Sequence, residues 1–191
     1  MTRLALCAAL VLAAPALARD VAGVNVPEAL AVEGAELALN GAGLRRATMF
    51  RVKVYVGALY LSTPSKDPEA IVRADEPKSV HMRFLRGVGR DKIMDAFREG
   101  FEKNSGAEAR ALQPGLDRIA AVLPAELKEG SQLAVTYLPG KGTVVEARGH
   151  GAASPSGEAT MEGKPFADAM FRIWLGPHPA DDDLKKAMLG R

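Results

Sequence analysis

The sequence predicts an α+β fold organised around an antiparallel sheet. Apolar residues at every second position predict strands near residues 35–39, 50–61, 79–85, 132–138 and 143–148, and a weaker one near 158–162. Segments with helical spacing follow in blocks after the strands near 79–85 and 158–162. Since βαβ units would alternate single strands with single helices, this order favours an antiparallel sheet.

The predicted strand at 50–61 has two chemically different faces. One face is apolar apart from a tyrosine hydroxyl, as a core face would be, and consists of Val52, Val54, Val56, Ala58 and Tyr60. The other face starts polar and ends apolar, in the order Arg51, Lys53, Tyr55, Gly57, Leu59 and Leu61. Such a face could hold an anionic head group at one end and an apolar tail at the other.

Glycine-rich segments flank the predicted strands. Residues 41–44, Gly-Ala-Gly-Leu, are interpreted as a turn before the strand at 50–61. Residues 139–142, Pro-Gly-Lys-Gly, separate two later strands and are typical of a hairpin turn.

Four segments have the spacing of amphipathic helices. The first three apolar stripes are Ile93, Met94, Phe97 and Phe101; Leu116, Ile119, Ala120 and Leu123; and Phe166, Met170, Ile173 and Trp174. The fourth helix is expected over residues 181–189. The first helix is predicted to have Asp91 as its N-cap and to end before Gly106. The second is predicted to stop at Pro124, and the third to begin at Pro165 and end at Gly176.

The first eighteen residues are predicted to be a secretory signal peptide. Arg3, the apolar run 4–12 and the small residues 16–18 supply its three parts, so cleavage is expected after Ala18. Cys7 follows only six residues, too few for the apolar region that precedes a lipid-attachment cysteine. Removal of 18 residues from 191 leaves one domain over residues 19–191, with no cysteine and hence no disulfide. We expect a periplasmic or secreted protein.

Charge and residue spacing exclude several classes of function. The sequence has 25 Lys and Arg against 23 Asp and Glu, which gives no general electrostatic reason to bind nucleic acid. After the first eighteen residues, no stretch approaches the roughly 20 apolar residues of a membrane span. His81, His150 and His178 lack metal-ligand spacing, and the acids at 181–183 suit a helix N-terminus. No metal site and no cofactor are expected.

Two segments carry a resemblance to a known family. Gly41-Ala42-Gly43-Leu44-Arg45, followed by residues 53–61 (KVYVGALYL), resembles the first signature of the chalcone isomerase family, especially its bacterial chalcone-isomerase-like branch. Residues 175–185 (LGPHPADDDLK) are similar to the family's last signature. The resemblance covers residues 35–190 and implies an open-faced β-sandwich, in which helices cover a large antiparallel sheet and a ligand cleft lies between the layers.

The resemblance implies a role for one arginine but not for the rest of the enzyme's catalytic set. In true chalcone isomerases an arginine after the glycines stabilises negative charge that develops during cyclisation, and Arg45 occupies that place. The enzyme's other polar positions fall at Tyr55, Gly89, Ala96 and Ile173 of this chain. The resemblance therefore argues against true chalcone isomerase activity.

Plant fatty-acid-binding members of the family resemble this chain more closely at these positions. They pair the same arginine with a tyrosine on the strand, and the two hold a carboxylate, so Arg45 and Tyr55 would do so here. A guanidinium binds a carboxylate through two hydrogen bonds and a phenol adds a third. Apolar side chains of the covering helices would line a pocket for the tail, and the candidates are Met94, Phe97, Phe101 and Trp174.

Three classes of function remain open. The leading one is a binding protein for a lipophilic carboxylate. The second is an isomerase or intramolecular lyase acting on an unsaturated carbonyl compound, with Arg45 as the electrophile. The third is a non-catalytic envelope interaction module, in which Arg45 belongs to a solvated turn, Tyr55 packs across strands and the helix stripes only form the core.

Overall fold

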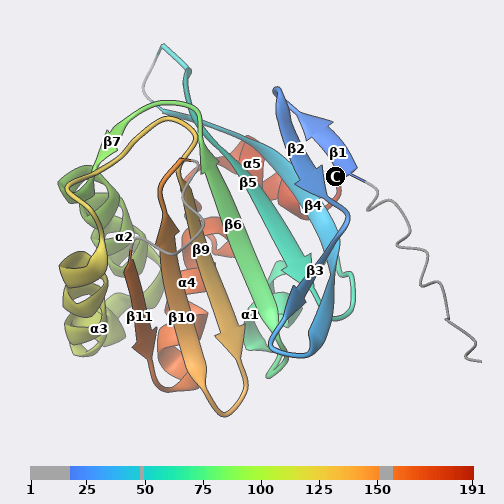
Figure 1. Ribbon diagram of the computed structural model, residues 1–191. Coiled ribbons are helices and arrows are strands. Elements are labelled where there is room, and N and C mark those ends of the chain that lie inside the picture. The colour runs from blue at the N-terminus through green and yellow to red at the C-terminus, as the bar shows by residue number, and fades with distance from the viewer. Residues whose placement is uncertain (1–17, 48–49, 151–156) are drawn as a thin grey trace, which may run out of the picture.

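A seven-stranded antiparallel sheet, in the order β11-β10-β9-β6-β5-β4-β3, forms the centre of the molecule (Figure 1). The computed structural model describes residues 18–47, 50–150 and 157–191, so the predicted signal peptide, apart from Ala18, lies outside the described residues. The strands are β3 Ala29–Val32, β4 Ala35–Ala47, β5 Val52–Leu61, β6 Lys78–Phe84, β9 Gln132–Leu138, β10 Gly142–Arg148 and β11 Gly157–Met161. Two further antiparallel pairs are β1 Ala18–Val21 with β2 Val24–Pro27, and β7 Val88–Gly89 with β8 Glu126–Leu127.

Helices cover one face of this sheet, whereas β1 and β2 lie towards the other (Figure 1). The helices are α1 Pro68–Arg73, α2 Arg90–Ser105, α3 Ala109–Val122, α4 Lys164–Leu175 and α5 Asp182–Met188, with a 3-10 turn over Gly106–Glu108. The larger apolar core lies between the sheet and the helices, and a smaller one contains Val26 of β2. The predicted α+β fold with a helix-covered antiparallel sheet is therefore confirmed. Within the described part of the chain, no helix is both long and apolar enough to cross a membrane.

The glycine-rich segment before β5 is not a turn, contrary to the sequence prediction. Gly41 and Gly43 lie inside β4, where α5 crosses the strand at very short range. A Cβ at Gly41 would lie 2.1 Å from the backbone oxygen of Ala187, and one at Gly43 would lie 2.5 Å from the Ala187 Cβ. The glycines therefore serve the close approach of a helix to a strand.

Strand β5 is buried on both faces, so the expected contrast between a core face and a ligand face is wrong in part. Tyr55, Leu59 and Leu61 belong to the larger core under the helices. Val56 belongs with Ala58 and Tyr60 to the smaller cluster on the opposite side of the sheet. The face predicted to bear the core thus packs on the minor cluster, because the N-terminal strands supply apolar side chains there.

Most predicted helix boundaries are confirmed, with one correction. Gly106 follows α2 with φ +53°, Pro165 lies in the first turn of α4, and Gly176 ends that helix. Helix α2, however, begins at Arg90 with Gly89 as its N-cap, so that Asp91 lies in the first turn and is not the cap. An acid in the first turn still suits the positive end of the helix dipole.

Candidate functional site

A β-bulge at the end of β4 places the first two predicted site residues together. Arg45 pairs with Tyr55 across the strands, but the next pair is Arg46 with Lys53, so Val54 has no partner of its own. Val54 and Tyr55 both join the core under the helices as a result. Asp181 holds the bulge, because its carboxylate accepts hydrogen bonds from the backbone N–H of Arg46 at 2.9 Å and of Leu184 at 2.9 Å.

The Arg45 guanidinium lies beside the Tyr55 ring. Its central carbon is 5.5 Å from the ring centroid, a distance at which a cation is attracted by the ring face. Arg45 Nε is fully buried, and no residue that the structure describes accepts a hydrogen bond from it. A buried N–H donor without an acceptor costs about 1–3 kcal/mol, so this arrangement favours an anion that accepts a hydrogen bond from Nε.

The Tyr55 hydroxyl is oriented by Trp174 of α4. Trp174 Nε1 donates a hydrogen bond of 2.9 Å to the Tyr55 hydroxyl oxygen. Burial raises the pKa of Tyr55, although the charge of Arg45 and the bond from Trp174 oppose that rise. Tyr55 therefore keeps its proton at neutral pH, and within the described residues that proton has no acceptor. The Arg45 Nε–H and the Tyr55 O–H are thus two neighbouring donors that have no acceptor among the described residues.

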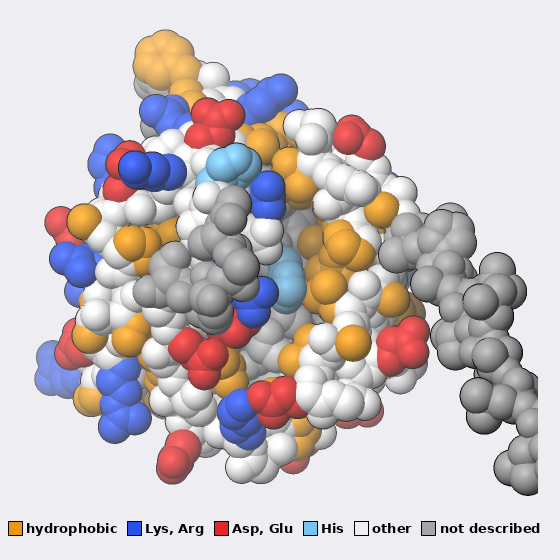
Figure 2. Space-filling model, in the orientation of Figure 1, with side chains coloured by type: hydrophobic (Ala, Val, Ile, Leu, Met, Phe, Trp, Pro, Cys, Tyr) orange, Lys and Arg blue, Asp and Glu red, His pale blue; other side chains and the backbone are white. Residues whose placement is uncertain are grey.

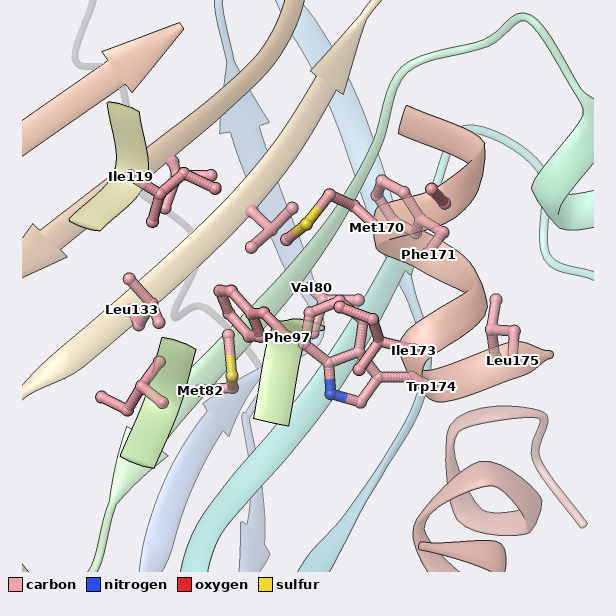
Figure 3. Packing of buried hydrophobic residues seen from close by; sticks show 14 of the residues in the cluster. Val80, Met82, Phe97, Ile119, Leu133, Met170, Phe171, Ile173, Trp174 and Leu175 are labelled. Carbon is pink, nitrogen blue, oxygen red and sulfur yellow. The ribbon is translucent and has the colours of Figure 1, made fainter. Parts of the chain in front are cut away.

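A small cavity adjoins these donors. It has a volume of about 50 Å³ and its lining includes Arg45, Tyr55, Phe97, Ile173 and Trp174. Phe97 of α2 and Trp174 of α4 meet edge to face, with ring centroids 6.3 Å apart, where the two helices lie side by side (Figure 3). A cavity of this size holds on the order of three or four water molecules. The space admits a carboxylate head but not a long tail.

The structure brings together four of the six predicted ligand-binding residues. Arg45, Tyr55, Phe97 and Trp174 line the cavity, whereas Met94 and Phe101 lie elsewhere in the core. Phe101 packs against Phe166 with ring centroids 5.6 Å apart, one full helical turn beyond Phe97. In this structure Met94 and Phe101 therefore pack in the core, outside the cavity lining.

Most of the cavity lining was not among the predicted ligand-binding residues, and Val54, Lys92 and Ala180 are three examples. Val54 was assigned to the opposite face, because a bulge cannot be seen in a period-two pattern. Lys92 lies just before Ile93, the first residue of the apolar stripe, and this position at the edge of the stripe was its one available signal. It adds a second cation to the lining.

Three of the four further positions where the resemblance places polar groups of the enzyme have no polar side chain here. Ala96 and Ile173 both line the cavity, beside Arg45. Gly89, at the third such position, is the N-cap of α2 and carries no side chain. At these three positions the chain therefore lacks the polar side chains that the resemblance assigns to the enzyme.

The remaining candidate residues have structural partners or lie elsewhere. Asp181 caps α5 as expected, and Asp183 forms an ion pair of 2.8 Å with Arg51. Among the residues with described positions, no group of three histidine, cysteine or acidic side chains is arranged to hold a metal ion. His81 lies on the sheet face opposite the helices, in the lining of a separate and larger hollow.

Comparison with known proteins places this fold. No curated protein matches the chain. The crystal structure of a fatty-acid binding protein from Arabidopsis thaliana is similar, with a TM-score of 0.65 and 15% sequence identity over 87% of this chain and 92% of that one. At this identity the likeness shows a shared fold. A sequence model described as chalcone isomerase-like matches residues 18–190, so the chain belongs to the chalcone isomerase-like family.

Proposed function

We propose that this protein binds a lipophilic carboxylate of the fatty-acid type, with the carboxylate on Arg45 and Tyr55. The observation that carries the proposal is the pair of donors without acceptors, the buried Arg45 Nε and the Tyr55 hydroxyl, beside an apolar cavity. A carboxylate offers acceptor sites to both donors and neutralises the guanidinium. The plant protein of similar fold is described as fatty-acid binding, which supports this ligand class.

Binding a long chain requires movement of the helical layer. The cavity of about 50 Å³ accepts the head group, and the contact between Phe97 and Trp174 closes the way for the tail. The tail would separate α2 from α4 and bring the deeper side chains of the predicted set, Met94 and Phe101, into contact with the ligand. If only the open state binds the tail, the apparent Kd equals the Kd of the open state divided by the fraction of molecules that are open.

Binding is better supported than cyclisation. An isomerase acting on an unsaturated carbonyl compound would use Arg45 as the electrophile, but Ala96 and Ile173 put apolar side chains where the enzyme of the resemblance has polar ones. We also propose that the protein is exported to the periplasm or the outside of a bacterium, on the basis of its N-terminal sequence. Mass spectrometry of the N-terminus of the protein purified from the envelope would test this, with Arg19 as the expected first residue.

The binding proposal is tested by titrating delipidated protein with palmitate and, in parallel, with hexadecanol, which has the same tail but no charge. Arg45→Gln should weaken palmitate binding about ten- to a hundredfold, because a hydrogen bond to a charged group contributes about 1.5–3 kcal/mol. Hexadecanol should bind wild type and Arg45→Gln alike. The matched control is Arg46→Gln, which changes the neighbouring guanidinium, absent from the cavity lining.

Two results would count against the proposal. Equal palmitate affinity of wild type and Arg45→Gln would remove the carboxylate from this site. If neither probe binds and native mass spectrometry shows no copurified lipid, a non-catalytic interaction module becomes the better interpretation.

A further inference from the structure

A hollow lies on the sheet face opposite the helices. Its volume is about 720 Å³, within the range of about 300–1,000 Å³ that is typical of small-molecule sites. The lining comes from β2 and β3 on one side and from β5, β6, β9 and β10 across the floor. Figure 2 shows this face hollowed between the N-terminal strands and the far strands of the sheet.

Small side chains in one row of the sheet leave this space open. His81 of β6 lies between Ala58 of β5 and Ala134 of β9 in the strand register, and all three line the hollow. Methyl groups on both sides leave the half-buried imidazole accessible from the hollow. The His81 ring also meets the ring of Tyr60 edge to face, with centroids 5.4 Å apart. The floor therefore offers a flat surface with an aromatic end.

The N-terminal strands form a fixed apolar wall of the hollow. The Tyr60 hydroxyl donates a hydrogen bond of 2.9 Å to the Pro27 carbonyl oxygen at the end of β2, which ties this wall to the sheet. Val26 is buried in the same cluster as Tyr60, and Leu30 packs against it. In Figure 2 hydrophobic side chains gather along this side of the hollow. An aromatic or aliphatic body would lose water-exposed apolar surface on both sides here.

Three cations and three carboxylates line the hollow, and two of the cations are in ion pairs. Lys141 forms an ion pair with Glu33, and Arg148 forms one of 3.3 Å with Glu146. The pKa of Lys141 is raised, chiefly by its hydrogen bond to Glu33, with a smaller contribution from the nearby charge of Glu158.

Arg83 is the exception. It is half-buried and lines the hollow, yet its guanidinium has no hydrogen-bond or ion-pair partner among the described residues. In the strand register it lies directly beside Gln132 of β9, which also lines the hollow and can add an amide donor to the same anion. The hollow thus combines an apolar floor and wall with one free guanidinium at its end.

We propose that this hollow is a second ligand site, separate from Arg45, that binds a flat lipophilic anion with its acidic group on Arg83 and Gln132. The apolar body lies across Ala58, His81 and Ala134 against the wall of β2 and β3. Burial lowers the pKa of His81 to about 4, so its imidazole is neutral at physiological pH and adds hydrogen-bonding capacity without charge. The floor then discriminates by shape, and Arg83 supplies the preference for an anion.

The test uses two fluorescent probes with nearly the same aromatic body. Anilinonaphthalene sulfonate carries an anionic group, whereas N-phenylnaphthylamine is neutral. Wild type should bind both with one site per chain, and a retained near-ultraviolet dichroism spectrum ensures that the signal comes from folded protein. Arg83→Gln should weaken the sulfonate probe about ten- to a hundredfold and leave the neutral probe unchanged. Arg86→Gln, at an exposed arginine absent from the lining, is the matched control.

A second variant tests the floor independently of charge. Ala134→Phe places a ring over His81 and should abolish binding of both probes, because the Ala134 side chain points into the hollow. The proposal is overturned if wild type binds neither probe, or if Arg83→Gln and Ala134→Phe both bind as wild type does. It is also overturned if Arg45→Gln, but not Arg83→Gln, removes sulfonate binding, since the probe would then occupy the cavity under the helices. Palmitate titrations of the same variants keep this outcome distinct from failure of the fatty-acid site.

Discussion

Replacing Tyr55 by phenylalanine tests the hydrogen bond on which the candidate site depends. The change removes one oxygen and leaves the Trp174 Nε1 donor without its partner at 2.9 Å. Trp174 is only 1% exposed and Tyr55 6%, so bulk solvent does not reach this donor. An unsatisfied buried donor costs about 1–3 kcal/mol. We expect the free energy of unfolding to fall by about 2 kcal/mol, and Tm by about 4–8 °C for a domain of this size.

Tyr60→Phe is the matched control for this change. Tyr60 is 1% exposed, and its hydroxyl also makes one hydrogen bond, to the Pro27 carbonyl oxygen. Pro27 lies at the exposed end of β2, where water can reach the freed carbonyl. Its loss should cost less, about 0.5–1 kcal/mol. Urea unfolding followed by the fluorescence of Trp174, the only tryptophan, measures both variants.

A double-mutant cycle isolates the bond itself. Tyr55→Phe, Trp174→Phe and the double variant are unfolded in urea and followed by far-ultraviolet circular dichroism. The coupling free energy should be about 1 kcal/mol or more. A coupling within about 0.3 kcal/mol of zero, or a Tyr55→Phe cost no larger than that of Tyr60→Phe, would refute the assigned role of the Trp174 donor.

Three further changes have defined outcomes. Gly41→Ala should lower the free energy of unfolding by about 3 kcal/mol, because its Cβ would lie 2.1 Å from the Ala187 oxygen. Gly89→Ala has no atom nearer than 3.9 Å and should change the free energy of unfolding by no more than about 0.5 kcal/mol, because the lower entropy of the unfolded chain and the poorer N-cap oppose one another. Equal urea midpoints of the two variants would contradict this. The pKa of His81 is lowered by burial to about 4, so stability present above pH 6.5 is lost as the pH falls towards 4. Urea unfolding at pH 7.5 and 5 should show wild type losing about 2 kcal/mol more than His81→Gln, and parallel losses would exclude this role. Arg45→Met should raise Tm by a few degrees while removing palmitate affinity, because it deletes a buried donor without a partner; a lowered Tm would show that Arg45 stabilises the fold.

Local patterns predicted the main strands and helices because each rests on a short-range signal. Pro165 and Gly176 bracket α4, and Asp181 begins α5, as helix-boundary chemistry predicts. The longer strands β4, β5, β6, β9, β10 and β11 have enough apolar residues to be recognised by a period of two. By contrast, β1, β2 and α1 are only four to six residues long, too short for a periodic pattern to identify them.

The part of the site that sequence could not predict depends on contacts between distant segments. Arg45 and Tyr55 were predicted together, but the bulge that turns Val54 to the same side is held by Asp181, 135 residues away from Arg46. The bond from Trp174 to Tyr55 spans 119 residues. The hollow around Arg83 was missed for the same reason, because its wall is built by β2 and β3, which no sequence signal linked to β6.

The glycines beneath α5 also bear on how the chain finds its correct alignment. Because β5 is apolar on both faces, a shift of its register against β4 by one residue would still bury apolar side chains. The hydrophobic effect alone would therefore discriminate little between the two registers. Gly43 lies opposite Gly57, and a methyl group on Gly57 would come within 2.8 Å of the end of the Met188 side chain. A slipped strand would bring Val56 or Ala58 to that place, and Met188 and Leu184 of α5 would have to shift to admit the larger side chain. The lack of side chains at these glycines, more than hydrophobicity, thus favours the native register of β4 and β5.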